Sequence, residues 1–167
     1  MTEPLIRVAS VDDREELEAL IDVCYSIIYP GWYDEDILNE ALPAMLRIDP
    51  KLLESGRYFS ATIDGRLAGC GGWSVSPPVG GTVSGTGHIR HFATHPDFMR
   101  KGVGSAILIR CIKEASSEGV EKLQCFSSHP GEPFYAQHGF STREPVTIMM
   151  GEGVAFPALL MERELGG

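Results

Sequence analysis

The residues best suited to chemistry lie in the run 94–105, where an expected strand ends and two glycines open an expected helix. Glycines let the backbone approach a ligand closely, and the first N–H groups of a helix have no partner within it. Those free donors and the positive end of the helix dipole bind anions. Arg100 and Lys101 add positive charge beside Gly102 and Gly104. The run therefore predicts a site for a phosphate or pyrophosphate.

Two common nucleotide-binding motifs do not fit this run. A P-loop requires G-x-x-x-x-G-K-[ST], which is absent, and a Rossmann fingerprint requires a third glycine where Ile107 stands. A Rossmann fingerprint also belongs at the first strand of a parallel sheet, whereas this run lies in the middle of the chain. The plain structural alternative is a strand-to-helix turn with solvated basic residues.

Hydrophobic periodicity and turn residues predict the elements that position this run. Asp64-Gly65 indicates a type I′ hairpin, and the Gly-, Pro-, Ser- and Thr-rich stretch Pro77–Gly87 indicates a loop. Helices are expected from the cap Ser10 to the break at Pro30, from Asp34 to just before Asp49-Pro50, over Gly102–Gly119 and over Pro133–His138. Strands are expected at Leu5–Ala9, Tyr58–Ile63, Leu67–Ser74, His88–Thr94, Leu123–Phe126, Val146–Met150 and Ala158–Met161.

The order of these elements, β-α-α-β-β-β-α-β-α-β-β, predicts a mixed α/β (α+β) fold. The chain has 167 residues, a usual length for one domain, and we expect residues 1–167 to form a single one. No internal repeat or low-complexity segment interrupts it.

Composition excludes several classes of protein. A net charge of −9 disfavours nucleic-acid binding, which depends on a surplus of Lys and Arg. The apolar stretches are far shorter than a membrane span, and the N-terminus does not resemble a signal peptide. The scattered cysteines are expected to be buried, reduced thiols. We therefore expect a cytoplasmic protein without a nucleic-acid or membrane partner.

The phosphate run resembles the acyl-CoA signature of the GNAT superfamily of N-acyltransferases, Q/R-x-x-G-x-G/A after a strand. Gly102 and Gly104 match its glycines, while Met99 stands where the family usually has Gln or Arg. A second segment, Phe134–Phe140, resembles the family's F-Y-x-x-x-G-F helix and turn. Two motifs in the expected order make the resemblance specific.

The resemblance implies a mostly antiparallel sheet of about seven strands flanked by about four helices. In this fold the strands His88–Thr94 and Leu123–Phe126 splay apart to admit acetyl-CoA, the cosubstrate. The implied acetyl-CoA contacts are Phe92, Ala93, Thr94, Met99, Arg100, Lys101, Gly102, Val103, Gly104, Ser105 and Ser128.

The resemblance also implies catalytic roles. His88 occupies the position where several relatives carry a Glu or His base, and a histidine pKa near 6.5 suits proton abstraction around neutral pH. Strand alternation places His88, Arg90, Phe92 and Thr94 on one face and His91 on the other, so His91 is the second candidate. A water relay is a further alternative. Tyr135 matches the tyrosine that protonates the departing thiolate.

Tyr25, Tyr29, Trp32 and Tyr33 cluster around the break between the first two helices. The resemblance implies that this break lines the acceptor site, with Tyr29, Trp32 and Tyr33 as its candidate residues. Aromatic rings beside the carboxylates of residues 34–36 can hold an ammonium group. Equally, the aromatics belong to the core and Asp34 is a helix cap.

The implied function is an N-acetyltransferase that uses direct attack by a primary amine, of a small molecule or peptide, in a ternary complex. The alternative is a non-catalytic acyl-CoA sensor. Analogy with relatives also suggests a homodimer. A metal site at His88, His91 and His95 is not expected, because these side chains diverge on a strand and no nearby cysteine or carboxylate completes a zinc set.

Overall fold

The computed structural model describes residues 3–78, 80–150 and 153–166. Its helices are α1 (Arg14–Ile28), α2 (Glu35–Met45), α3 (Pro50–Glu54), α4 (Val103–Ser117) and α5 (Glu132–Gln137), with short 3-10 turns at Val11–Asp13 and Pro96–Phe98. Its strands are β1 (Leu5–Val8), β2 (Tyr58–Ile63), β3 (Arg66–Ser74), β4 (Thr86–Thr94), β5 (Lys122–Ser127), β6 (Ser141–Met150) and β7 (Val154–Glu164).

The strands form one sheet in the order β1-β2-β3-β4-β5-β7-β6. All neighbours are antiparallel except β4 and β5, which pair in parallel over only three residues each, Thr86–His88 with Lys122–Gln124. Beyond His88 the two strands separate. The expected seven-stranded, mostly antiparallel sheet with a splay between these strands is confirmed.

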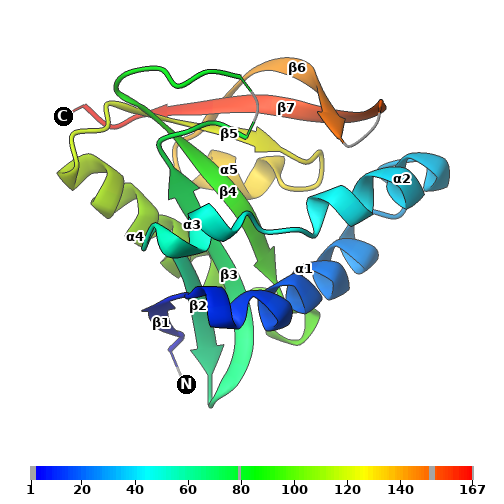
Figure 1. The fold of residues 1–167 in the computed structure, drawn as a ribbon, viewed down its shortest axis with the longest axis horizontal. Coiled ribbons are helices and arrows are strands. Elements are labelled where there is room, and N and C mark those ends of the chain that lie inside the picture. The colour runs from blue at the N-terminus through cyan, green and yellow to red at the C-terminus, as the bar shows by residue number, and fades with distance from the viewer. Residues whose placement is uncertain (1–2, 79, 151–152, 167) are drawn as a thin grey trace.

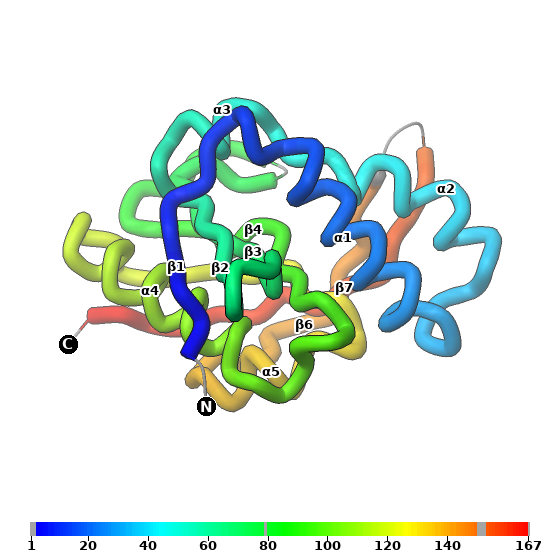
Figure 2. Tube along the Cα trace, turned by 90° about the horizontal axis from the view of Figure 1, so that it is seen from below, coloured from blue at the N-terminus to red at the C-terminus, as the bar shows by residue number. Residues whose placement is uncertain are grey.

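Helices cover both faces of the sheet (Figures 1 and 2). Helices α1, α2 and α3 pack on the face that we call the front, in a core that includes Tyr25, Tyr58 and Cys70. Helices α4 and α5 pack on the rear face, in a second core that includes Trp73 and Ile107. Figure 2 shows α1 and α3 on one side of the sheet and α5 on the other.

A β-bulge in β4 overturns the expected facing of its residues. Gly72 pairs with Arg90 and Cys70 pairs with Ala93, so Gly71 alone stands opposite both His91 and Phe92. The extra residue reverses the alternation. His88, Arg90 and Ala93 therefore face the front, while Ile89, Phe92 and Thr94 face the rear. The prediction that His88 and Arg90 share a face with Phe92 and Thr94 is wrong.

Local sequence explains the remaining elements. Asp64 and Gly65 have φ of 51° and 79°, which confirms the type I′ hairpin. Helix α3 was not predicted: Asp49-Pro50 was interpreted as the end of a helix, but the Asp49 carboxylate caps a new one by accepting from the Lys51 N–H.

Five strands are longer than predicted, with β3 and β5 extended by only one or two residues at their ends. Strand β4 begins at Thr86, inside the expected loop, and β6 and β7 extend well beyond the predicted cores of Val146–Met150 and Ala158–Met161. The added residues of β6 are mostly polar and exposed, so hydrophobic alternation does not reveal them.

Candidate active site

A cleft of about 460 Å³ opens where β4 and β5 separate. Its rear wall is the first turn of α4 with the residues before it, and its far side is α5 and the loop that precedes it. Its front wall is the inner side of α1, with Tyr25 and Tyr29. The cleft therefore passes through the splay and joins the two faces of the sheet.

The rear wall is built from backbone. Gly102 caps α4 with a φ of 77°, a left-handed conformation that glycine adopts without strain. Arg100 also has a positive φ, 62°. A side chain at Gly104 would place its Cβ 3.1 Å from the ring of Phe134, so the first turn lies directly against α5. The free N–H groups of this turn and the dipole of the 15-residue helix make the wall a binding site for an anion.

All of the expected acetyl-CoA contacts except Lys101 line the cleft: Phe92, Ala93, Thr94, Met99, Arg100, Gly102, Val103, Gly104, Ser105 and Ser128. Lys101 is exposed and lies outside the lining. Ser105 forms a hydrogen bond of 2.9 Å between its Oγ and Nε2 of His138, which fixes the hydroxyl beside the first turn of α4.

Tyr135 lines the cleft from α5 and is 8% exposed. Burial raises the pKa of its hydroxyl well above the usual value of 10, and the neighbouring Cys125 adds to the effect. Burial also raises the pKa of the Cys125 thiol to about 12. Tyr135 therefore stays protonated and can donate a proton, and Cys125 is not a thiolate nucleophile.

Two buried tyrosines hold the bulge of β4. Tyr58 donates a hydrogen bond of 2.7 Å to the carbonyl oxygen of His91, and Tyr25 donates one of 3.2 Å to that of Phe92. These bonds satisfy carbonyls that the bulge removes from the ladder between strands. They also hold His91 at a φ of 49°, which is uncommon for a residue other than glycine.

His91 lines the cleft and faces the front, not the side opposite His88 as predicted. Burial, assisted by the charge of Arg90, lowers the pKa of its imidazole to about 4, although Glu18 and a hydrogen bond with the Met45 backbone act in the opposite direction. The ring is therefore neutral at neutral pH.

His88 lies at the closed end of the splay between β4 and β5, because it is the last residue of β4 that pairs with β5. It is 4% exposed and is not part of the cleft lining, although its neighbour Ile89 is. Its Nε2 is buried without a hydrogen-bond partner among the described residues. Burial, and then the charge of Arg90, lowers the pKa of its imidazole below 6.5.

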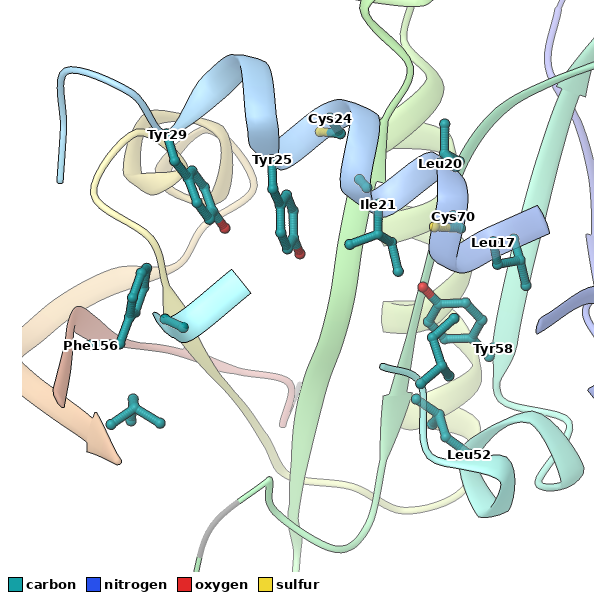
Figure 3. Close-up of a cluster of buried hydrophobic side chains, with 14 of the residues drawn as sticks. Leu17, Leu20, Ile21, Cys24, Tyr25, Tyr29, Leu52, Tyr58, Cys70 and Phe156 are labelled. Atoms are coloured by element: carbon teal, nitrogen blue, oxygen red, sulfur yellow. The ribbon is translucent and has the colours of Figure 1, made fainter. Parts of the chain in front are cut away.

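The three expected acceptor residues have different surroundings. Tyr29 lines the cleft and stacks on Tyr25 with ring centroids 4.7 Å apart. Figure 3 shows Tyr25 on α1 and Tyr29 at its C-terminal end, with Phe156 opposite Tyr29. Tyr33 is buried outside the lining, where its hydroxyl accepts a 2.8 Å hydrogen bond from the His129 N–H. Trp32 also lies outside the lining and is 57% exposed.

Sequence comparison identifies the fold described above. The acetyltransferase (GNAT) family matches residues 15–140, which include the cleft residues of α1, β4, α4 and α5. The chain belongs to this family. No curated protein matches the sequence.

Solved structures of GNAT proteins share the fold of this chain. A GCN5-related N-acetyltransferase from Rhodopseudomonas palustris is 20% identical, with a TM-score of 0.79 over 98% of this chain and 97% of that one. The PaiA N-acetyltransferase of Thermoplasma acidophilum, solved with coenzyme A, is 17% identical, with a TM-score of 0.71 over 97% and 99%. The ribosomal-protein-S18-alanine N-acetyltransferase of Escherichia coli is 17% identical, with a TM-score of 0.65 over 98% and 95%.

Sequence reasoning missed several residues of the GNAT cleft. Cys24 lines it from α1, and Cys125, Phe126 and Ser127 line it from β5. Tyr25, which belongs to the predicted aromatic cluster, also lines the cleft, and it lies four residues after Ile21 on the buried stripe of α1. Its hydrogen bond to the bulge had no signal, because the bulge itself was not predicted.

In the described residues of this GNAT protein, no three His, Cys, Asp or Glu side chains gather as a metal site requires. His88, His91 and His95 are not brought together in such a group. None of the described helices is long and apolar enough to span a bilayer.

Proposed function

We propose that the chain is an N-acetyltransferase that moves the acetyl group of acetyl-CoA to a primary amine of a small molecule or peptide, by direct attack in a ternary complex. The observation that carries the proposal is the cleft between β4 and β5, which joins an anion-binding helix terminus to buried proton donors and acceptors. Family membership supports acyl-CoA as the donor.

The residues present fit acetyl-CoA. The first turn of α4 offers backbone donors for the pyrophosphate, and only glycine at position 104 leaves this turn free against Phe134. The backbone of β4 from Phe92 to Thr94 lies along the cleft without a β5 partner. Tyr25 already donates to the Phe92 carbonyl and β3 pairs with Ala93 and Thr94, so we assign the amides of the pantetheine arm to the backbone groups that these contacts leave unpaired. Acetyl-CoA supplies the activated thioester.

Acyl transfer from a thioester requires a neutral amine and a protonated leaving group. We assign the base to His88, whose neutral imidazole has a free Nε2, and the acid to Tyr135. As the amine nitrogen bonds to the acetyl carbon, the carbon–sulfur bond breaks. His88 takes the proton from nitrogen, directly or through a water, and Tyr135 gives one to sulfur.

His91 is the second candidate for the base because it lines the cleft. Its pKa of about 4 makes it a weaker base than His88, whose pKa is lowered less far from 6.5. Tyr29 is the expected acceptor residue that lines the cleft, and we propose it as an acceptor contact in preference to Trp32 and Tyr33.

Ligand-dependent thermal unfolding tests the proposal. A ligand at about 100 times its dissociation constant adds about 2.7 kcal/mol to the free energy of unfolding, which raises the midpoint of a domain of this size by about 5–10 °C. We expect this shift with acetyl-CoA and with CoA but not with ATP or NAD. A shift with ATP or NAD alone refutes the proposal.

Turnover separates an enzyme from an acyl-CoA sensor. Release of CoA thiol in the presence of an amine panel is expected for the wild type, and Tyr135→Phe should slow it while acetyl-CoA still raises the unfolding midpoint. Binding without transfer to any amine would favour the sensor.

We further propose that the protein works in the cytoplasm, with no nucleic acid, membrane or metal as partner, and as a possible homodimer. The net charge of −9 supports only the absence of a nucleic-acid partner. Sedimentation of the purified protein at two concentrations tests the oligomeric state.

A further inference from the structure

Arg90 stands on the front face of β4, two residues from the proposed base His88. Side chains two positions apart on a strand share a face and are separated by roughly 7 Å along it. The bulge begins directly after Arg90, so Arg90 keeps the facing of His88 and not that of Phe92. The rear wall with its anion-binding helix terminus lies on the other face, so Arg90 does not serve the phosphate site.

The guanidinium of Arg90 is half-buried and has few partners. Its Nη1 donates a hydrogen bond of 3.1 Å to Oγ of Ser74, and that hydroxyl donates in turn to the carbonyl oxygen of Ser76. No carboxylate of the described residues lies within 4.0 Å of it. Of the five N–H donors that an arginine carries, one therefore has a partner in the described chain.

Most of the other arginines have a carboxylate partner, although the half-buried Arg163 instead donates to the carbonyl oxygen of His138. Six of them form ion pairs with carboxylates in the described chain: Arg7, Arg14, Arg57, Arg66, Arg110 and Arg143. Burial lowers the pKa of Arg90, and the more distant charge of Asp49 offsets this only in part. A half-buried guanidinium is normally paired, because removing a charge from water costs free energy that a counter-ion returns.

His88 supplies a second group on the same face that lacks a partner in the described chain. Its Nε2 is buried and has no hydrogen-bond partner among the described residues. An anion site beside a free base matches a molecule that carries both a carboxylate and an amine. A purely cationic acceptor is disfavoured there, because Arg90 repels an ammonium group.

We propose that the acceptor is an amino acid or a related small molecule, whose carboxylate Arg90 binds on the front face while its amine lies at His88. Arg90 then acts as a specificity residue, since its planar fork binds a carboxylate through two parallel hydrogen bonds. This inference rests on the proposed acetyltransferase function. It narrows the acceptor to one chemical class.

A matched panel of acceptors tests the inference. The probes are the common L-amino acids and the corresponding α-carboxamides, each offered with acetyl-CoA, and product is measured by mass spectrometry. We expect at least one amino acid to be acetylated with a kcat/KM about 30- to 100-fold above that of its amide, as loss of a hydrogen-bonded charge implies.

Two variants connect this preference to Arg90. In Arg90→Gln the ratio of the rates for acid and amide should fall to near 1 through a rise in the KM of the amino acid, with the affinity for acetyl-CoA retained. Arg90→Lys should retain part of the preference, because it keeps the charge and loses the fork. Arg7→Gln, a change at an exposed arginine on β1, should leave the preference intact.

The possible failures are distinguishable. Equal rates for acids and amides, or a preference that survives in Arg90→Gln, overturn the inference and leave the acetyltransferase function standing. Acetylation of neither panel, with acetyl-CoA still stabilising the protein, also overturns it. Absence of stabilisation by acetyl-CoA refutes the underlying function instead.

Discussion

The two walls of the cleft differ in the groups that they present, which are mainly backbone on one wall and side chains on the other. The rear wall, at the first turn of α4, presents backbone N–H groups and two glycines. The front side presents specific side chains: the two tyrosines of α1, the neutral His91, and beyond them His88 and Arg90. Backbone donors on the rear wall suit a phosphate group of any ligand. The side chains on the front side suit an acceptor with one particular arrangement of polar groups.

This difference predicts that the two sides will tolerate substitution differently. Met99 stands where the family usually has Gln or Arg, yet the turn that follows keeps its geometry because its donors belong to the backbone. On the front side each function belongs to one side chain, so a single substitution removes it. Variants on either side can therefore separate binding of acetyl-CoA from reaction with the acceptor.

The largest expected effect is that of His88→Gln on the front side. Loss of a general base typically slows turnover about 100- to 1,000-fold, and we expect this fall in kcat with no change in affinity for acetyl-CoA. In the wild type, protonation of His88 should lower kcat/KM only below pH 6.5, because the pKa of its imidazole is lowered from 6.5. Above pH 6.5 titration of His88 should leave kcat/KM unchanged.

His95→Asn is the matched control, because asparagine also accepts the hydrogen bond that His95 receives from the Asp97 N–H. Its kcat should be close to that of the wild type. If His88→Gln turns over normally and His91→Asn does not, the base is His91.

On the rear wall, Gly104→Val should weaken acetyl-CoA binding by about 100-fold, measured by calorimetry. A Cβ there meets the Phe134 ring at 3.1 Å, so the turn must shift and lose charge-assisted hydrogen bonds of about 1.5–3 kcal/mol each. Gly81→Val, at an exposed site with open space around it, should bind normally. Unchanged affinity in Gly104→Val would place the phosphate site elsewhere.

His91 offers a test of the front side through stability. An unfolded histidine binds a proton below about pH 6.5, whereas folded His91 does so only near pH 4. Its contribution to stability is therefore complete above pH 6.5 and is lost as the pH falls toward 4. Between pH 7 and 4.5 this amounts to about 2–3 kcal/mol.

Urea denaturation at the two pH values measures this loss. His91→Asn should show a smaller loss than the wild type, and asparagine suits the left-handed backbone at this site. An identical loss in both proteins would mean that His91 is accessible to protons in the folded state.

The smallest expected effect concerns Tyr33. Tyr33→Phe removes the hydrogen bond that the His129 N–H donates but keeps the ring stacked on His129, so we expect a loss of about 1 kcal/mol in the free energy of unfolding. Trp32→Phe, at an exposed site, should change stability by less than about 0.5 kcal/mol. A kcat loss without a stability loss in Tyr33→Phe would instead return Tyr33 to the acceptor site.

Hydrophobic periodicity and glycine positions predicted most of the elements, the hairpin and the turn before α4, because Gly102, Gly104 and Asp64-Gly65 have backbone requirements that few other residues meet. The antiparallel sheet and its splay were expected from the resemblance to the GNAT superfamily, not from these patterns. The front side was harder. The bulge depends on a histidine at a positive φ, held by hydroxyls from β2 and α1, and this long-range arrangement has no local signature. One inserted residue then reversed the faces of Phe92 and Thr94. Trp32 and Tyr33 differ in burial for the same reason, since tertiary packing decides it.

The short pairing of β4 with β5 also has a mechanical consequence. Strands β1–β4 and strands β5–β7 are two blocks of one sheet, joined edge to edge over only three residues on each strand. A ligand held by β4 on one side and by the loop before α5 on the other would bridge the blocks at their open end. In the free protein, amide hydrogens of β5 and β7 should exchange with solvent in an unfolding event that leaves β4 protected. When a ligand fills the cleft, the amides of β4, β5 and β7 should exchange in one common unfolding event. Ligand binding in the cleft would thus make unfolding of the whole sheet more cooperative.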